Sequence, residues 1–156
     1  MATPTLERTT ARSLIGDELF DRMAARIAAE EKLPAEVAGR IVEQALVFLV
    51  AASRNQSGLP LAPSPMVDLG WHTFILYTAD YAAFCERVAG RFLHHAPTDD
   101  GRTAGDPKVV RQQTLAAMAA TGYAVDPELW TGGADCDVSG EGDKCSQCHQ
   151  GCTDSP

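Results

Sequence analysis

Residues 42–52 would be apolar nearly all round as a helix, and a helix of that kind must be enclosed by other elements. Pro34 stands where a first-turn proline belongs, so this helix is expected to run from Ala35 to about Arg54. The longest unbroken apolar run, residues 45–52, has eight residues, far short of the roughly 20 that cross a bilayer. The sequence therefore predicts a central buried helix and no membrane span.

The rest of the chain carries further helix signals and no strand pattern. Apolar side chains recur every three or four residues, and caps or stops flank these repeats, as Asp17, Asp106 and Gly90 do. The other helices are expected at residues 17–32, 66–76, 78–89 and 107–121, with a last turn at 127–130. The predicted fold is all-α, a small bundle of about five helices in residues 16–130, between a flexible leader at 1–15 and an irregular, Cys-rich tail at 131–156.

Charge and composition narrow the classes of function. The chain has a formal net charge of −8 and a pI of about 4.8, which argues against a nucleic-acid partner. The N-terminus has no hydrophobic core followed by a cleavage site, so it predicts no secretory signal and a cytoplasmic location. Cysteines stay reduced in the cytoplasm, which favours metal binding over disulfides.

Four of the five cysteines fall in the tail, which has almost no apolar side chains and cannot order itself by hydrophobic burial. Thiolates at a C-x8-C-x2-C-x3-C spacing can instead close a tetrahedral site around a soft metal ion. Zinc is the default ion, and an iron–sulfur cluster or Cu(I) would use the same ligands. The expected ligands are Cys136, Cys145, Cys148 and Cys152, with His149 able to replace one thiolate.

Other interpretations of the tail stay open. Cys145, Cys148 and His149 also match the C-x-x-C-H pattern of haem attachment, which is disfavoured because the tail has no apolar pocket and the chain no export signal. Two disulfides would require an exported protein. A disordered acidic tail without metal is the plainest alternative, since residues 131–156 hold five acids and one base.

A second group of candidate ligands combines an aspartate with three of the four histidines. Asp68 precedes His72 by one helical turn, so both side chains leave one stripe of the helix. His94 or His95 could approach this stripe if the chain folds back after Gly90, and three ligands with an open position would describe a catalytic metal site. The alternative is structural: Asp68 caps the helix, His72 makes a buried hydrogen bond, and the other two histidines form a surface turn.

The same region carries the signature Asp-x-x-Trp-His, then a Tyr with a nearby Cys, and a later His. These places are held by Asp68, Trp71, His72, Tyr81, Cys85, Gly90, His94 and His95. In residues 66–97 the chain thereby resembles the glycine-rich domain-containing protein-like family. The resemblance implies a helical fold and no particular activity, and the tail is not part of it. Some members have a second His two places after the first, where this chain has Phe74.

Three classes of function follow from these features. The leading one is an intracellular binding module whose tail holds zinc or another soft metal and which serves a protein partner as an interaction or accessory factor. The second is a metal-dependent enzyme that uses Asp68, His72 and His94 or His95, although no nucleophile motif or phosphate loop accompanies them. In the third, the helical part is a scaffold and partner enzymes modify the tail. The sequence leaves the metal, the substrate and the oligomeric state open.

Overall fold

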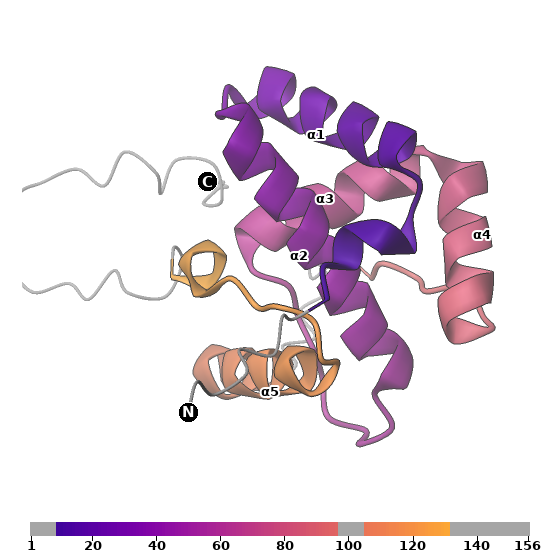
Figure 1. The fold of residues 1–156 in the computed structure, drawn as a ribbon. Helices are drawn as coiled ribbons and strands as arrows, with labels where there is room; N and C mark the ends of the chain where they lie inside the picture. Colours follow the sequence, from indigo (N-terminus) through magenta and orange to yellow (C-terminus); the bar gives the residue numbers. More distant parts are fainter. Residues whose placement is uncertain (1–8, 97–104, 132–156) are drawn as a thin grey trace, which may run out of the picture.

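The longest helix, α2 (Ala35–Arg54), forms the centre of the fold, and the other elements pack around it (Figure 1). In this computed structural model, residues 9–96 and 105–131 are described. They form five α-helices, two 3-10 turns and no strand, which confirms the all-α prediction. The remaining elements are η1 (Ala11–Leu14), α1 (Asp17–Glu31), α3 (Pro65–Leu76), α4 (Thr78–Ala89), α5 (Pro107–Ala120) and η2 (Pro127–Trp130).

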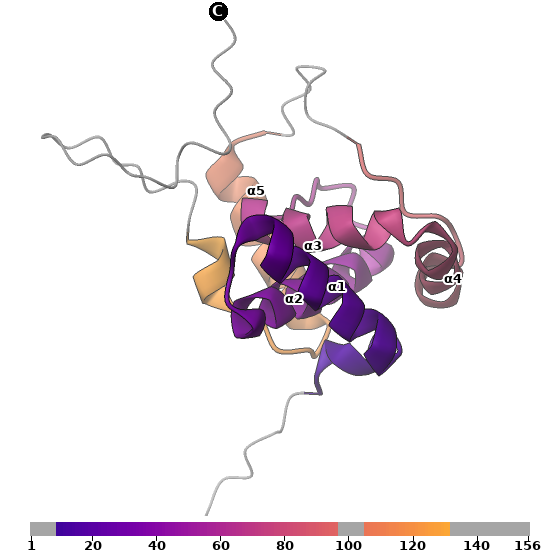
Figure 2. The same cartoon turned by 90° about the horizontal axis from the view of Figure 1, so that it is seen from above.

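Helix α2 is buried along most of its length, as its apolar run predicted. Each side chain in residues 45–51 is at most 2% exposed. A large apolar side chain contributes roughly 1.5–3 kcal/mol when it is fully buried, so this helix supplies much of the core. Helices α1, α3 and α5 pack against it. Seen from above, α4 lies at one side of the bundle, and α5 with η2 lies at the other (Figure 2).

The N-terminal boundary of the helical domain differs from the sequence prediction. Ala11 falls in the expected leader, yet it is fully buried, and its backbone N–H donates to the Glu43 carboxylate (3.2 Å). Ile15 also joins the core. Gly16 is the N-cap of α1, and Asp17, the expected cap, is the first helical residue. Among the described residues, the packed core therefore already includes Ala11 and Ile15, because apolar side chains in this stretch reach it.

Helix α3 approaches α2 closely at Gly70. A Cβ atom at this position would lie 2.7 Å from the Cβ atom of Ala45 and 2.8 Å from the backbone oxygen of Ile41. Real Cβ atoms essentially never make contacts this short, so the observed spacing of the two helices requires glycine. Gly70 therefore fixes the position of α3 on the core.

The ends of the helices follow the capping signals in the sequence. The Ser64 hydroxyl caps α3 by accepting from the Val67 N–H (3.2 Å), and it donates to the Leu129 carbonyl (2.7 Å). The Asp106 carboxylate caps α5, as predicted. Gly90 ends α4 in the left-handed conformation, with φ of 66°, which glycine adopts without strain. These ends set where the chain turns back toward α3.

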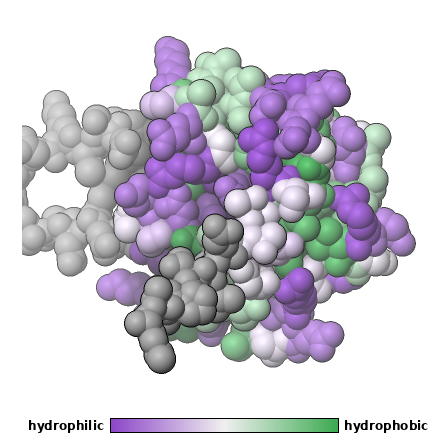
Figure 3. Space-filling model, viewed as in Figure 1, coloured by the Kyte–Doolittle hydropathy of each residue, from purple (hydrophilic) through white to green (hydrophobic). Residues whose placement is uncertain are grey.

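The surface carries no unusual apolar feature in the face that Figure 3 shows, which is mostly hydrophilic with smaller apolar areas. Leu59, Leu76, Phe92 and Val109 are large apolar side chains that are exposed. Single exposed apolar residues of this kind are ordinary in folded proteins. In the described ranges, no helix combines the length and the apolar character needed to cross a bilayer.

Candidate metal centre

One face of α3 carries two of the predicted ligands. Ser64 and Pro65 start the helix, which places Asp68 in its first turn and His72 one turn later. Nε2 of His72 lies 3.5 Å from Oδ2 of Asp68. The two side chains share a stripe, as their four-residue spacing predicted, at a distance longer than an ordinary hydrogen bond.

The third candidate ligand comes from the segment that follows α4. The chain turns back toward α3, and Nε2 of His95 lies 2.7 Å from Oδ1 of Asp68. His94 lies apart: it is exposed, and its ring packs on Phe92 with 4.8 Å between ring centroids. Of the two histidines that the sequence left open, His95 therefore joins Asp68 and His72.

Asp68, His72 and His95 together are called the Asp68 cluster. One ligand atom from each residue, a carboxylate oxygen or an imidazole nitrogen, lies within 4.8 Å of the other two. The side chains of Asp68 and His95 are 26% and 20% exposed, whereas that of His72 is 57% exposed. The cluster is thus held by the protein on its inner side and open to solvent on its outer side.

The Asp68 cluster can be compared with the geometry of a transition-metal site. Two ligand atoms on one tetrahedral ion stand about 3.4 Å apart when the metal–ligand bonds are about 2.1 Å long. The two carboxylate–imidazole separations are 2.7 Å to Oδ1 and 3.5 Å to Oδ2, so the first is a hydrogen bond that would have to lengthen around an ion. Two imidazoles and one carboxylate are a donor set that zinc and ferrous iron both use. The residue types of the cluster are therefore ones that can ligate a metal ion.

A buried hydrogen-bond chain lies against the cluster. The Trp71 indole N–H donates to the Tyr81 hydroxyl (2.9 Å), and this hydroxyl donates to the Leu93 carbonyl (2.5 Å). The Trp71 ring also packs against His95, with 4.2 Å between ring centroids. Burial raises the pKa of Tyr81, so the phenol keeps the proton that it donates.

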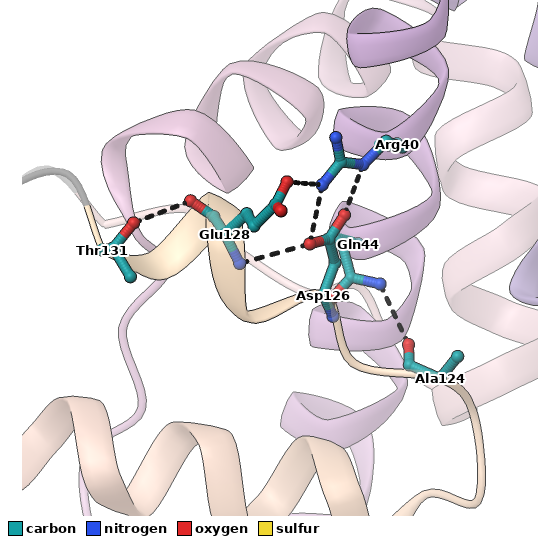
Figure 4. Close-up of polar contacts among 6 residues, drawn as sticks. All are labelled: Arg40, Gln44, Ala124, Asp126, Glu128 and Thr131. Atoms are coloured by element: carbon teal, nitrogen blue, oxygen red, sulfur yellow. Dashed lines mark hydrogen bonds and ion pairs between the residues drawn. The ribbon is translucent and has the colours of Figure 1, made fainter.

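A second polar network lies where residues 124–131 pack on α2 (Figure 4). Nε and Nη2 of Arg40 donate to the two carboxylate oxygens of Asp126 (2.6 and 2.9 Å), and Nη2 also donates to Glu128 (2.6 Å). Gln44 donates to the Ala124 carbonyl and accepts from the Asp126 N–H. The hydrogen bond from Arg40 is the main cause of the lowered pKa of Asp126. We call Arg40, Asp126 and Glu128 the Arg40 network.

The Arg40 network joins the segment of residues 124–131 to α2. A surface hollow of about 280 Å³ lies beside it, lined by Arg40, Glu43, Gln44 and residues 124–127. The carboxylates of Asp126 and Glu128 bind the Arg40 guanidinium. A guanidinium has no lone pair to offer a metal. The network therefore fastens the segment that contains η2 to α2.

Three further predictions from the sequence concern Cys85, the structural alternative for Asp68 and His72, and the tail. Cys85 is fully buried, as expected for a core residue. The structural alternative for Asp68 and His72 is wrong in two details, because Ser64 is the cap of α3 and His72 is exposed. The predicted tail ligands lie outside the described residues; they are Cys136, Cys145, Cys148, Cys152 and His149.

Two sets of contacts were not found from the sequence. Arg40 and Asp126 are 86 residues apart, and no local pattern links them. The sequence places Trp71 and Tyr81 in a signature and on apolar helix faces, but residue spacing cannot show that an indole N–H and a phenol meet. Only the packing of α4 and its following segment on α3 reveals this contact.

Among the comparisons with known proteins, the chain matches one family model. No curated protein and no solved structure matches the chain. The sequence model of the UCP032817-like family matches residues 13–112, which is more than half of the chain. This range contains all three residues of the Asp68 cluster and ends before the tail. The chain therefore belongs to the UCP032817-like family.

Proposed function

We propose that this protein binds a divalent transition-metal ion through Asp68, His72 and His95. The observation that carries the proposal is the convergence of three ligand atoms within 4.8 Å of one another. The ligands come from α3 and from the segment after α4, so the tertiary fold and not only a helical repeat brings them together. Zinc and ferrous iron are the ions that best match this donor set.

The position of His72 supports a metal site over a purely structural ion pair. Asp68 and His95 already make a close, partly buried contact of 2.7 Å. His72 adds a second imidazole on the other carboxylate oxygen, at 3.5 Å and with its side chain 57% exposed. A contact of that length at the surface contributes little to stability. As a third metal ligand, the same side chain has a clear role.

The solvent-exposed outer side of the cluster would leave room for a water molecule or a substrate on a bound ion. Three protein ligands leave a coordination position for water or for a substrate, which is the arrangement of catalytic metal sites. A bound zinc ion would lower the pKa of such a water toward neutrality. Asp68, His72 and His95 would hold the ion, and solvent could reach it past His72.

Cobalt binding tests this proposal. The protein to use is the full chain with Cys136, Cys145, Cys148 and Cys152 changed to serine, so that tail thiolates cannot contribute. We expect one equivalent of Co²⁺ to bind and to give visible d–d bands without thiolate charge-transfer bands. His95→Ala should remove this binding, whereas His94→Ala, at the neighbouring exposed histidine, should leave it unchanged. Equal binding by both variants, or no binding by their parent, would refute the proposal.

The tail carries a second and independent proposal, favoured by the C-x2-C spacing of Cys145 and Cys148. We propose that Cys136, Cys145, Cys148 and Cys152, with His149 as an alternative ligand, bind zinc or another soft metal in support of an interaction role. Elemental analysis of the natural chain and of the serine-substituted chain distinguishes the two sites. Metal that disappears with the cysteines belongs to the tail, and metal that remains belongs to the Asp68 cluster.

A further inference from the structure

We propose that Tyr81 is a positioning residue of the Asp68 cluster: its buried hydroxyl holds the backbone at Leu93 so that His95 reaches Asp68. This inference rests on the proposed metal site and adds a residue that does not touch the ion. It assigns a role to a phenol that lies on α4, between the two elements that supply the ligands.

The hydroxyl of Tyr81 joins three parts of the fold. Tyr81 is 1% exposed. It accepts a hydrogen bond from the indole N–H of Trp71 on α3, and it donates one to the carbonyl of Leu93 in the segment after α4. Both hydrogen bonds are buried, so neither partner can exchange the phenol for water without cost. One oxygen atom therefore sets the distance between α3 and the backbone that carries His95.

The segment that contains His95 makes few other hydrogen bonds to described residues. Residues 91–96 form no helix or strand. No backbone–backbone hydrogen bond joins them to other described residues. Within the described part of the chain, their hydrogen bonds to other elements are the one from Tyr81 to Leu93 and the one between His95 and Asp68. The side chain of Leu93 also packs in the core. Of the two hydrogen bonds, the one from Tyr81 is thus the one that does not involve a candidate ligand.

Tyr81 also fixes the surface on which the His95 ring rests. The rings of Trp71 and His95 have centroids 4.2 Å apart, with 49° between their planes. Because the Trp71 N–H is bound by Tyr81, the indole is held in one orientation under the imidazole. The hydroxyl thereby controls both the backbone position and the ring position of His95.

The substitution Tyr81→Phe removes the hydroxyl that positions His95 and keeps the aromatic ring that packs in the core. The Tyr81 ring makes edge contacts with Phe74 and Phe92, with centroids 5.1 and 5.2 Å away. Tyr81→Phe keeps this ring and leaves the Trp71 N–H and the Leu93 carbonyl without their partner. Loss of a group that orients a metal ligand typically lowers metal affinity about 10–100-fold. We expect a loss of that size with the helical fold retained.

Cobalt titration of the serine-substituted full chain tests the role of Tyr81. Tyr81→Phe should weaken Co²⁺ binding about 10–100-fold. Tyr77→Phe is the matched control, because Tyr77 ends α3 and takes no part in this hydrogen-bond chain; it should leave the affinity unchanged. In a His95→Ala background, Tyr81→Phe should have no further effect on any residual binding. An unchanged affinity in Tyr81→Phe, or an equal loss with and without His95, would overturn the proposal.

A metal-free readout keeps the test separate from the metal proposal. Nuclear Overhauser contacts between the ring protons of Trp71 and His95 should be present in the unsubstituted protein and in Tyr77→Phe, and lost in Tyr81→Phe. Trp71→Phe, which removes only the indole donor and part of the ring, should loosen His95 in the same direction. If the parent chain binds no Co²⁺, the metal proposal fails, and these contacts still decide whether Tyr81 positions His95. Contacts that persist in Tyr81→Phe would refute the role of the hydroxyl.

Discussion

Two aspartates each join a helix to a distant segment of the chain, but their partners differ in kind. Asp126 binds both nitrogens that Arg40 turns toward it, while Asp68 faces the imidazoles of His95 and His72. A guanidinium stays protonated and offers only donors, so Arg40 cannot ligate a metal and instead joins two parts of the fold. A neutral imidazole has a lone pair, so the Asp68 cluster can exchange its internal contacts for bonds to a metal. Both regions use an aspartate, so the difference between a structural ion pair and a candidate metal site comes from the partner, arginine in one and histidine in the other.

Exposure separates the two regions in the same way. The side chain of Asp126 is 19% exposed, and its charge is met by a partly buried cation. In the Asp68 cluster, the outer imidazole is 57% exposed and only loosely held. The first region should therefore matter mainly for stability, and the second mainly for binding.

The largest expected change in the free energy of unfolding is at the contact between α2 and α3. Both regions depend on this contact, since Arg40 lies on α2 and Asp68 lies on α3. Gly70→Ala should lower the free energy of unfolding by about 3 kcal/mol, since the new methyl group meets the backbone oxygen of Ile41. Gly39→Ala is the matched control. Its Cβ atom would meet only Phe20, at 3.8 Å, so the helix-favouring substitution should stabilise by about 0.5–1 kcal/mol. Urea unfolding of both variants checks the pair, and equal stabilities would contradict the close packing.

The next largest effect is expected in the Arg40 network. Arg40→Met should cost about 2 kcal/mol of unfolding free energy, because it leaves the partly buried Asp126 carboxylate without its cation. The control is Arg26→Met, which breaks an exposed pair with Glu30 on one helix and should cost less than about 0.5 kcal/mol. If the two substitutions lower the free energy of unfolding equally, the Arg40 network does not stabilise the packing of residues 124–131 on α2.

Acid should weaken the Arg40 network selectively. The pKa of Asp126 is lowered in the folded protein, chiefly by its hydrogen bond from Arg40. Its contribution to stability is therefore complete above the unfolded pKa of about 3.9 and is lost as the pH falls through the lower, folded pKa. Urea midpoints measured from pH 5 down to pH 2 should fall less steeply for Arg40→Met than for the unsubstituted chain. Parallel pH profiles would contradict this assignment.

The smallest effect on stability is expected in the Asp68 cluster without metal. With a chelator present, His72→Ala should change the free energy of unfolding by less than about 0.5 kcal/mol, because the side chain is exposed and its contact is long. His95→Ala should cost about 1 kcal/mol, through the lost hydrogen bond to Asp68. Thermal melts in EDTA test both values. If His72→Ala lowers the free energy of unfolding as much as Arg40→Met does, the role of the cluster is structural.

The sequence predicted the elements of this fold because the signals for them are local. The apolar run of α2, Asp106 and Gly90 at helix ends, and the four-residue spacing of Asp68 and His72 each act within a few positions. The burial of Ala11 was missed, because a small apolar residue in a polar stretch gives no periodic signal.

The site itself was only half predictable, because its remaining contacts depend on tertiary packing. The choice of His95 over His94 depends on how residues 91–96 cross α3, which no spacing rule gives. The hydrogen bonds of Tyr81 and the pairing of Arg40 with Asp126 join separate elements in the same way. Sequence reasoning therefore found which residue types could act, and the structure shows which of them meet.

X-ray absorption at the zinc edge tests the central claim most directly, since it reports the atoms bound to the ion. The sample is the full chain with its four tail cysteines changed to serine, loaded with one equivalent of zinc. We predict a first shell of nitrogen and oxygen at about 2.0–2.1 Å with the scattering of two imidazoles. His95→Ala should lose one imidazole or all of the zinc. Zinc that is not retained by the parent chain, or a spectrum unchanged by His95→Ala, would contradict a metal site at the Asp68 cluster.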